Sequence, residues 1–190
     1  MDKSKVYWED LGVTAEISAF APQGKIEEFH AMLHVEPKAE LFDGQLKRIY
    51  EGEKRLLQLP QVMGADVILK RYFLSDSTNQ QPLMKQEADC SVSVIQQPPL
   101  DGSKVAVWLY LQKGSKVANV NGVIVAEHNG YRHLWKMGMH EHKGDSAWQT
   151  ESLLISYEET LQRHVGRQLH PYVVFRTRCR HPIRRHGEST

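Results

Sequence analysis

Arg71 and Arg176 are cations within apolar, strand-like segments, and both have the chemistry to bind an anionic ligand. The planar guanidinium group binds a carboxylate through two parallel hydrogen bonds. In the segment "ADVILKRYFL", strict strand alternation places Arg71 on one face with Val67 and Leu69, and places Lys70 on the other face. A structural ion pair is the alternative, because partly buried arginines usually have an acidic partner. Both arginines are therefore candidate ligand-binding residues.

Glutamates on two predicted helices are the second group with useful chemistry. Glu158 lies in a predicted helix over residues 147–165, and Glu53 lies in a predicted helix over residues 41–57. A carboxyl group that faces a cleft and is partly desolvated can act as a general acid. The alternative is a solvated helix face, where glutamate is common. We retain Glu158 as a candidate ligand-binding residue and assign no catalytic residue.

Histidine and cysteine, which often bind transition metals, form no recognisable metal motif here. His140-Glu141-His142 could chelate zinc or nickel through its two imidazoles, but no third ligand has a characteristic spacing. The two cysteines, Cys90 and Cys179, form neither a metal spacing nor a disulfide framework. Cys90 opens an alternating, valine-containing segment, which favours a buried, inert thiol. The sequence therefore predicts no metal and no cofactor.

The elements that must position these residues follow from apolar periodicity and turn residues. In chain order they are strands over 13–21 and 26–35 joined by a Pro-Gln-Gly-Lys turn, a helix over 41–57, a strand over 67–74, a short helix reaching residue 88, and a hairpin of strands over 90–96 and 104–112. This β-β-α-β-α-β-β order predicts an α+β fold in which a sheet carries helices on one face.

A second, incomplete copy of this order follows residue 114. A shift of about 105 residues aligns segment 28–72 with segment 133–177 without a gap, and it places Arg71 on Arg176 and Glu53 on Glu158. The second copy then has a hairpin over 122–139, a helix over 147–165 and a strand over 172–179. We predict a complete unit over residues 1–114, a partial unit over 115–180 and a basic tail over 181–190.

The segments "KRYFLSDSTNQQP" and "VIQQPPLDGSKVAVWLYL", together with the element order, resemble the RidA/YjgF superfamily of reactive-intermediate deaminases. Members of that superfamily were earlier labelled endoribonuclease L-PSP or translation-initiation inhibitor. The partial repeat resembles the long, two-copy branch that includes the chorismatases. The resemblance implies a chorismate-mutase-like (YjgF-like) α+β unit, a homo-oligomer such as a trimer or a pseudo-oligomer formed by the repeat, and ligand clefts between units.

The resemblance also implies an arginine at the start of the fourth strand, where the deaminases hold the substrate carboxylate. Asp89 stands at that position in the segment "DCSVSV". An anion there would repel an imino-acid carboxylate, which argues against an unmodified deaminase site. The resemblance further implies that chorismatase chemistry depends largely on the later part of the second copy.

Three classes of function remain open. The first is an enzyme or binding protein for a small carboxylate-bearing metabolite, either chorismatase-like or a divergent imine deaminase. The second is a non-catalytic structural or binding unit, and the third is an RNA-binding or RNA-cleaving protein. The net charge of +1 gives no electrostatic argument for nucleic acid or for an anionic membrane. The absence of an apolar stretch near 20 residues argues against a membrane span, and the cysteine usage favours the cytoplasm.

Overall fold

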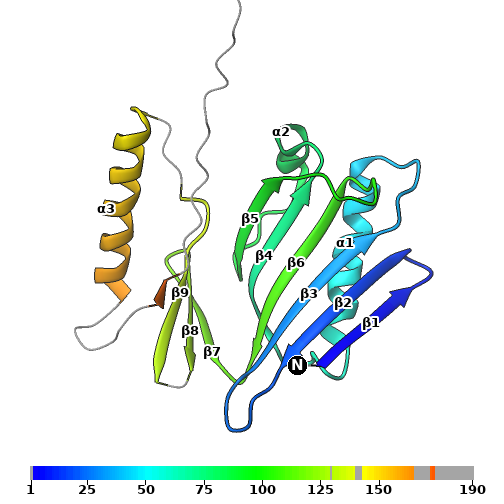
Figure 1. Ribbon diagram of the computed structural model, residues 1–190, viewed down its shortest axis with the longest axis horizontal. Coiled ribbons are helices and arrows are strands. Elements are labelled where there is room, and N and C mark those ends of the chain that lie inside the picture. Colours follow the sequence, from blue (N-terminus) through cyan, green and yellow to red (C-terminus); the bar gives the residue numbers. More distant parts are fainter. Residues whose placement is uncertain (1, 129, 140–142, 165–171, 174–190) are drawn as a thin grey trace, which may run out of the picture.

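Two mixed β-sheets and the helices that cover them make up the computed structural model, which describes residues 2–128, 130–139, 143–164 and 172–173 (Figure 1). The architecture is α+β. The first sheet, sheet A, has the strand order β1-β2-β3-β6-β4-β5. Its strands are β1 (Asp2–Trp8), β2 (Val13–Phe20), β3 (Glu27–Val35), β4 (Asp66–Leu74), β5 (Ser91–Gln96) and β6 (Val105–Lys113). All neighbouring pairs are antiparallel except β4 and β5, which are parallel.

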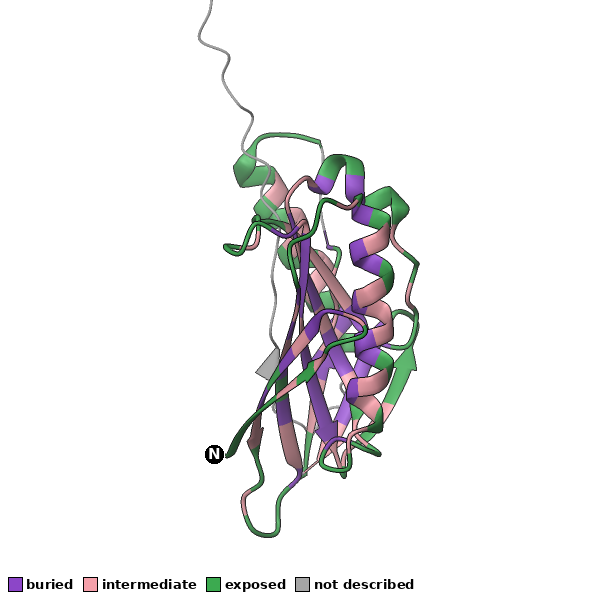
Figure 2. Cartoon of the chain, turned by 90° about the vertical axis from the view of Figure 1, so that its right-hand side faces the viewer, coloured by how far each residue is buried: buried purple, intermediate pink, exposed green. Residues whose placement is uncertain are grey.

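Helix α1 (Phe42–Gln58) packs along one face of sheet A, as Figure 2 shows edge-on. Its buried stripe includes Leu46, Ile49 and Leu56, which meet alternate residues of the strands beneath. Gly52 lies on the same stripe, and a Cβ atom there would come within 2.9 Å of Val13 Cγ1. The missing side chain therefore allows the helix backbone to approach β2 closely.

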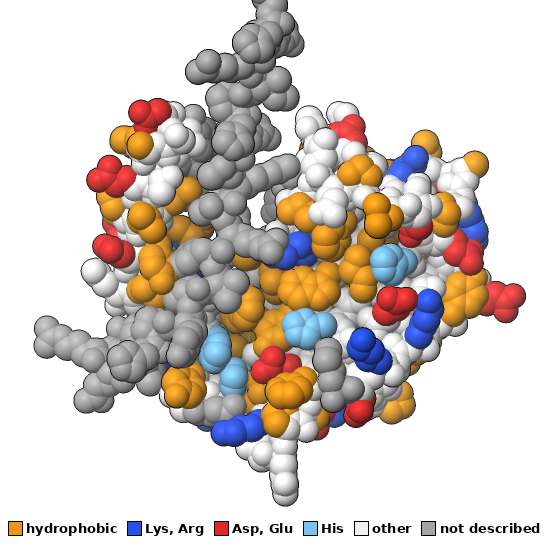
Figure 3. All heavy atoms as spheres, viewed as in Figure 1, with side chains coloured by type: hydrophobic (Ala, Val, Ile, Leu, Met, Phe, Trp, Pro, Cys, Tyr) orange, Lys and Arg blue, Asp and Glu red, His pale blue; other side chains and the backbone are white. Residues whose placement is uncertain are grey.

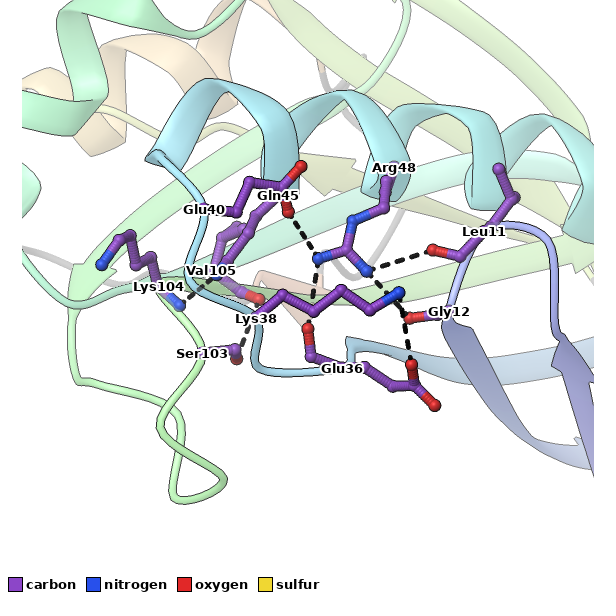
Figure 4. Close-up of polar contacts among 10 residues, drawn as sticks. All are labelled: Leu11, Gly12, Glu36, Lys38, Glu40, Gln45, Arg48, Ser103, Lys104 and Val105. Carbon is purple, nitrogen blue, oxygen red and sulfur yellow. Dashed lines mark hydrogen bonds and ion pairs between the residues drawn. The ribbon is translucent and has the colours of Figure 1, made fainter.

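Arg48 fastens α1 to the loops at one end of sheet A (Figure 4). Its guanidinium donates to the carbonyl oxygens of Leu11, Gly12 and Glu36 at 3.1, 3.3 and 3.1 Å, and to Glu40 Oε2 at 2.6 Å. Three chain segments thus converge on a single side chain. This arrangement links α1 to the loop after β1 and to the end of β3, where the Gly12 carbonyl also accepts from the Glu36 backbone at 2.8 Å.

The predicted opening hairpin and long helix are confirmed, but the prediction of a second hairpin over residues 90–112 is wrong. β2 pairs with β3 in antiparallel register, and α1 spans nearly the predicted range. β5 and β6 do not pair, because β4 lies between them and binds both. β1 was not predicted. The predicted short helix is divided into α2 (Ser77–Gln80) and a 3₁₀ turn (Gln81–Leu83), and it ends before residue 88.

The predicted strict alternation of side chains between the two faces of the sheet is also wrong at the start of β4. The β4–β6 register shifts between Val67 and Leu69, which marks an irregularity at Ile68. Val67 packs against the core beneath α1, whereas Leu69 belongs to the cluster on the opposite face. From Leu69 onward the alternation holds. The bulge therefore sets which face receives Arg71.

The second sheet, sheet B, has the order β10-β9-β8-β7 and lies beside the face of sheet A that α1 leaves open (Figure 1). Its strands are β7 (Lys116–Val120), β8 (Val123–His128), β9 (Tyr131–Trp135) and β10 (Tyr172–Val173). Ile124 and Ala126 of β8 pack on Ile68, Leu69 and Tyr110 of sheet A.

Helix α3 (Ser146–His164) covers the other face of sheet B, through Leu161 against Val123 and Leu134. The β8–β9 hairpin and this helix are confirmed within the described residues. The strand expected over 172–179 is described only as β10, and the expected basic tail over 181–190 lies outside the described residues. β7 was not predicted. Whether these elements are a second copy of the first unit stays a prediction.

Candidate functional site

Arg71 lies on the open face of sheet A, the face opposite α1. Its guanidinium carbon is 5.3 Å from the centroid of the Trp108 ring, across the β4–β6 pair. Its Nε donates a long hydrogen bond of 3.5 Å to Ser93 Oγ on β5. The residue is 9% exposed. A guanidinium over an aromatic face in so dry a setting gains a cation–π contribution, and its charge is only weakly screened.

A row of aromatic side chains extends from Arg71 across the open face. The His30 ring stacks on Trp108 with centroids 5.6 Å apart and planes 12° apart, and it lies 5.1 Å from the Tyr110 ring. Tyr110 in turn lies 5.3 Å from the Trp135 ring of sheet B. The row therefore spans the junction of the two sheets. Figure 3 shows this face, with apolar and histidine side chains gathered at its centre.

Hydrogen bonds fix the Tyr110 end of this row. The Tyr110 hydroxyl donates to Glu28 Oε2 at 2.9 Å, and it accepts from Gln112 Nε2 at 2.7 Å. Burial raises the pKa of Tyr110, so its hydroxyl stays protonated at neutral pH. These contacts hold the rings in place. The aromatic surface is thus preorganised.

A cavity of about 450 Å³ opens on the same face, and its lining includes Phe73 of β4 but not Arg71. Its floor includes Phe73, two residues beyond Arg71 on the same face of β4, and Met32, which pairs with Trp108 in the β3–β6 register. One wall is the loop of residues 97–101, which joins β5 to β6. The remaining lining residues are Lys5, Thr14, Glu16, His34 and Ala106.

Polar side chains stand at the rim of this cavity. Lys5 Nζ and Glu16 Oε1 form an exposed ion pair of 3.0 Å. His34 Nδ1 lies 3.8 Å from Asp101 Oδ2, and the other oxygen of Asp101 accepts from the Ser103 backbone at 2.9 Å. The cavity therefore combines an apolar floor with a few groups that can fix the orientation of a polar ligand.

Lys70 points in the opposite direction from Arg71 and is buried beneath α1. Its ammonium donates to Glu53 Oε2 at 2.6 Å and forms an ion pair with Glu87 Oε2. The Tyr72 hydroxyl lies 3.0 Å from Glu53 Oε1 and 2.8 Å from Glu87 Oε1. These four side chains close a ring, which we call the buried ring. It was not predicted, although Glu53 falls on the apolar stripe of α1 between Ile49 and Leu56.

Burial and the charges of neighbouring groups shift the pKa values of Glu53, Lys70 and Tyr72 in the buried ring. Burial raises the pKa of Glu53, and the positive charge of Lys70 only partly offsets this effect. Burial by itself would lower the pKa of Lys70, but Glu53 and Glu87 raise it, so the ammonium stays charged. Burial likewise raises the pKa of Tyr72. Lys70 therefore has a structural role. Of these two neighbouring residues, only Arg71 lies on the open face.

The remaining predicted residues are dispersed. Glu158 is exposed on α3, which lies on the far side of sheet B from sheet A in Figure 1. Arg176 and the His140-Glu141-His142 motif lie outside the described residues. Asp89 is exposed just before β5, and the adjoining Cys90 is buried. Burial raises the pKa of the Cys90 thiol to about 12, which keeps it in the unreactive protonated form.

Metal and membrane features are not seen in the part of the chain that is described. There, no three histidine, cysteine, aspartate or glutamate side chains come close enough to hold a metal ion. The described helices also include none with the length and apolarity to cross a bilayer. The chain matches no family model, no curated protein and no solved structure.

Proposed function

We propose that the open face of sheet A binds a small carboxylate-bearing metabolite, and that the chain is a divergent, RidA/YjgF-like protein of the chorismatase-like or imine-deaminase-like kind. The observation that carries the proposal is the position of Arg71. Its guanidinium lies between Trp108 and Ser93 on the face where the cavity opens. Phe73, two residues further along β4, lines that cavity. An arginine in this setting can hold a carboxylate at the end of an otherwise apolar site.

The size and lining of the cavity agree with such a ligand. Small-molecule pockets are typically about 300–1,000 Å³ and mainly apolar, with few polar groups. The cavity beside Phe73 falls within this range at about 450 Å³. The aromatic surface of Trp108 and His30 next to Arg71 favours a planar, unsaturated acid over a flexible aliphatic one. The proposal also includes the expected cytoplasmic homo-oligomer or pseudo-oligomer.

A direct test is calorimetric titration with chorismate and with benzoate as a simple planar acid. We expect binding by the wild-type protein and an affinity about tenfold or more lower for Arg71→Gln, since a charge-assisted hydrogen bond contributes about 1.5–3 kcal/mol. Arg55→Gln is the matched control, because Arg55 lies on α1 and binds Asp10 on the other side of the sheet. Equal affinities of wild type and Arg71→Gln would contradict the proposal.

Turnover separates an enzyme from a binding protein. Chromatography after incubation with chorismate would show pyruvate and a hydroxybenzoate or dihydroxy acid if the chain is chorismatase-like. An imine-hydrolysis assay that includes Asp89→Arg tests whether an arginine at the expected position restores deaminase activity. Binding without turnover in both assays would favour the non-catalytic alternative, which is supported by the use of Lys70 and Glu53 in a structural ring.

A further inference from the structure

The buried ring has one proton donor too few for the contacts that it makes. The Lys70 ammonium has three protons and satisfies Oε2 of both Glu53 and Glu87. The Tyr72 hydroxyl has one proton, yet it lies within 3.0 Å of Glu53 Oε1 and 2.8 Å of Glu87 Oε1. It can donate to only one of these oxygens. If both carboxyl groups were ionised, the second oxygen would face the hydroxyl oxygen with no proton between them.

Charge leads to the same conclusion. Glu53 is 6% exposed and Tyr72 is fully buried, whereas the side chains of Lys70 and Glu87 are 12% and 21% exposed. Uncompensated charge is therefore penalised most at Glu53. Two carboxylates and one ammonium sum to a net charge of −1. One additional proton makes the ring neutral and completes its hydrogen bonds.

The geometry assigns this proton to Glu53. Glu87 faces three donors, namely the Lys70 ammonium, the Tyr72 hydroxyl and the Cys90 thiol, whose sulfur lies 3.7 Å from Glu87 Oε2. These donors satisfy both oxygens of the Glu87 carboxyl group. Glu53 receives only the Lys70 ammonium once the Tyr72 proton is committed to Glu87. A protonated Glu53 then donates to the Tyr72 oxygen.

We propose that Glu53 is a buried proton-binding site that fastens segment 84–90 to α1 and β4. Glu87 belongs to this segment, which leads directly into β5. Loss of the Glu53 proton gives the ring a net negative charge and sets its carboxylate against the Glu87 carboxylate. The repulsion weakens the hold on segment 84–90. The site is distinct from the open face and does not depend on the ligand proposed above.

The other ionisable groups around the ring do not supply an alternative proton. From α1, Tyr50 accepts from the Lys85 backbone at 3.1 Å, and its ring contacts the Lys85 ammonium at 5.1 Å. Just before β5, the Cys90 thiol is held protonated by burial, which raises its pKa. Lys70 and Tyr72 are the groups that β4 contributes. Burial raises the pKa of Glu53, in agreement with the assignment.

The first experiment is a carbon-13 NMR titration of the side-chain carboxyl groups in the full chain. We expect the Glu53 resonance to have the chemical shift of a protonated acid at neutral pH and to change only as the pH is raised. Glu16 is the internal reference: it is exposed, its hydrogen bond with Lys5 lowers its pKa, and it therefore titrates well below neutral pH. An ionised Glu53 in the folded protein at neutral pH would overturn the proposal. This measurement requires no variant.

The second experiment compares Glu53→Gln with Glu16→Gln by hydrogen exchange. The glutamine amide can donate to Tyr72 and accept from Lys70, so Glu53→Gln reproduces the protonated ring without its titration. Between about pH 6 and about pH 9, exchange in segment 84–90 should accelerate about tenfold in the wild type and in Glu16→Gln, after correction for intrinsic rates. Glu53→Gln should lack this acceleration. The same acceleration in Glu53→Gln would refute the coupling of segment 84–90 to this proton.

Discussion

Lys70 and Arg71 are adjacent in the chain, but their side chains lie on opposite faces of sheet A. The Lys70 ammonium binds Glu53 of α1, and the Arg71 guanidinium lies over Trp108 on the open face. This follows from the two-residue period of a strand once the bulge at Ile68 has set the register. Two similar charges therefore have separate roles, one in the fold and one in the proposed ligand site.

Removal of the Lys70 charge should destabilise the protein strongly. Lys70→Met removes the cation from the buried carboxyl group of Glu53 and from the partly exposed carboxyl group of Glu87, and breaking a buried pair costs about 3–5 kcal/mol. Urea unfolding would measure the change in the free energy of unfolding. Lys54→Met is the control, because the Lys54–Glu51 pair is exposed and should contribute less than about 1 kcal/mol. Similar losses for both variants would argue against a structural role of the ring.

Two glycines of α1 should respond differently to alanine. At Gly52 a Cβ would lie 2.9 Å from Val13 Cγ1 and 3.1 Å from Leu33 Cδ2, so Gly52→Ala overpacks the core and should destabilise by about 1–3 kcal/mol. At Gly44 the Cβ would overlap the Glu40 side chain, which must then give up its bond to Arg48. The gain in helix propensity and the loss of this partly exposed ion pair oppose one another, so Gly44→Ala should change stability by less than about 1 kcal/mol. Thermal unfolding of both variants tests this pair, and stabilisation by Gly52→Ala would contradict the close approach of α1.

Protonation of His133 in mild acid should lower the free energy of unfolding. Burial, and then the stacked His128 ring at 4.3 Å, lower the pKa of His133 below 6.5. The unfolded chain then binds a proton more readily than the folded one. Stability should be retained above about pH 6.5 and fall as the pH drops from there through the lowered pKa. The loss should stay below about 1 kcal/mol, because the ring is only partly buried. Urea unfolding at several pH values should show a shallower acid dependence for His133→Phe, and an unchanged dependence would count against the shift.

Cys90 should resist alkylation in the folded protein. It is 8% exposed, and its pKa of about 12 leaves almost no thiolate at about pH 8. In a Cys179→Ser background, mass spectrometry of the Cys90 peptide after iodoacetamide treatment would follow the reaction. We expect rapid labelling in urea and labelling slower by about tenfold or more without it. Equal rates in the two conditions would show that the thiol is accessible.

Local patterns in the sequence were sufficient for the elements that depend on neighbouring residues. The Pro-Gln-Gly-Lys turn and the alternation around it predicted the β2–β3 hairpin, and the apolar stripe through Ile49 predicted α1. β1 was missed because its exposed edge accepts the polar residues of "DKSKVYW", which lack strand-like alternation. Such strands are identified by their partner rather than by their own composition.

Pairing between distant strands could not be predicted in the same way. The segment "PPLDG" between β5 and β6 has the residues of a hairpin turn, but β6 instead pairs with β3 and β4. That choice depends on which pairing buries the most apolar surface beneath α1, which no local pattern encodes. The buried ring could not be predicted for the same reason. Glu53 was visible on the helix stripe, but its partner Glu87 comes from a segment without regular structure.

The place of β6 in sheet A bears on how the chain is made. β6 is the last strand of the sheet to leave the ribosome, yet it fills the gap between β3 and β4. Until residues 105–113 emerge, those two strands have bare backbone edges that can pair with other nascent chains. Translation stalls just before this point should therefore be more prone to aggregation than stalls just after it.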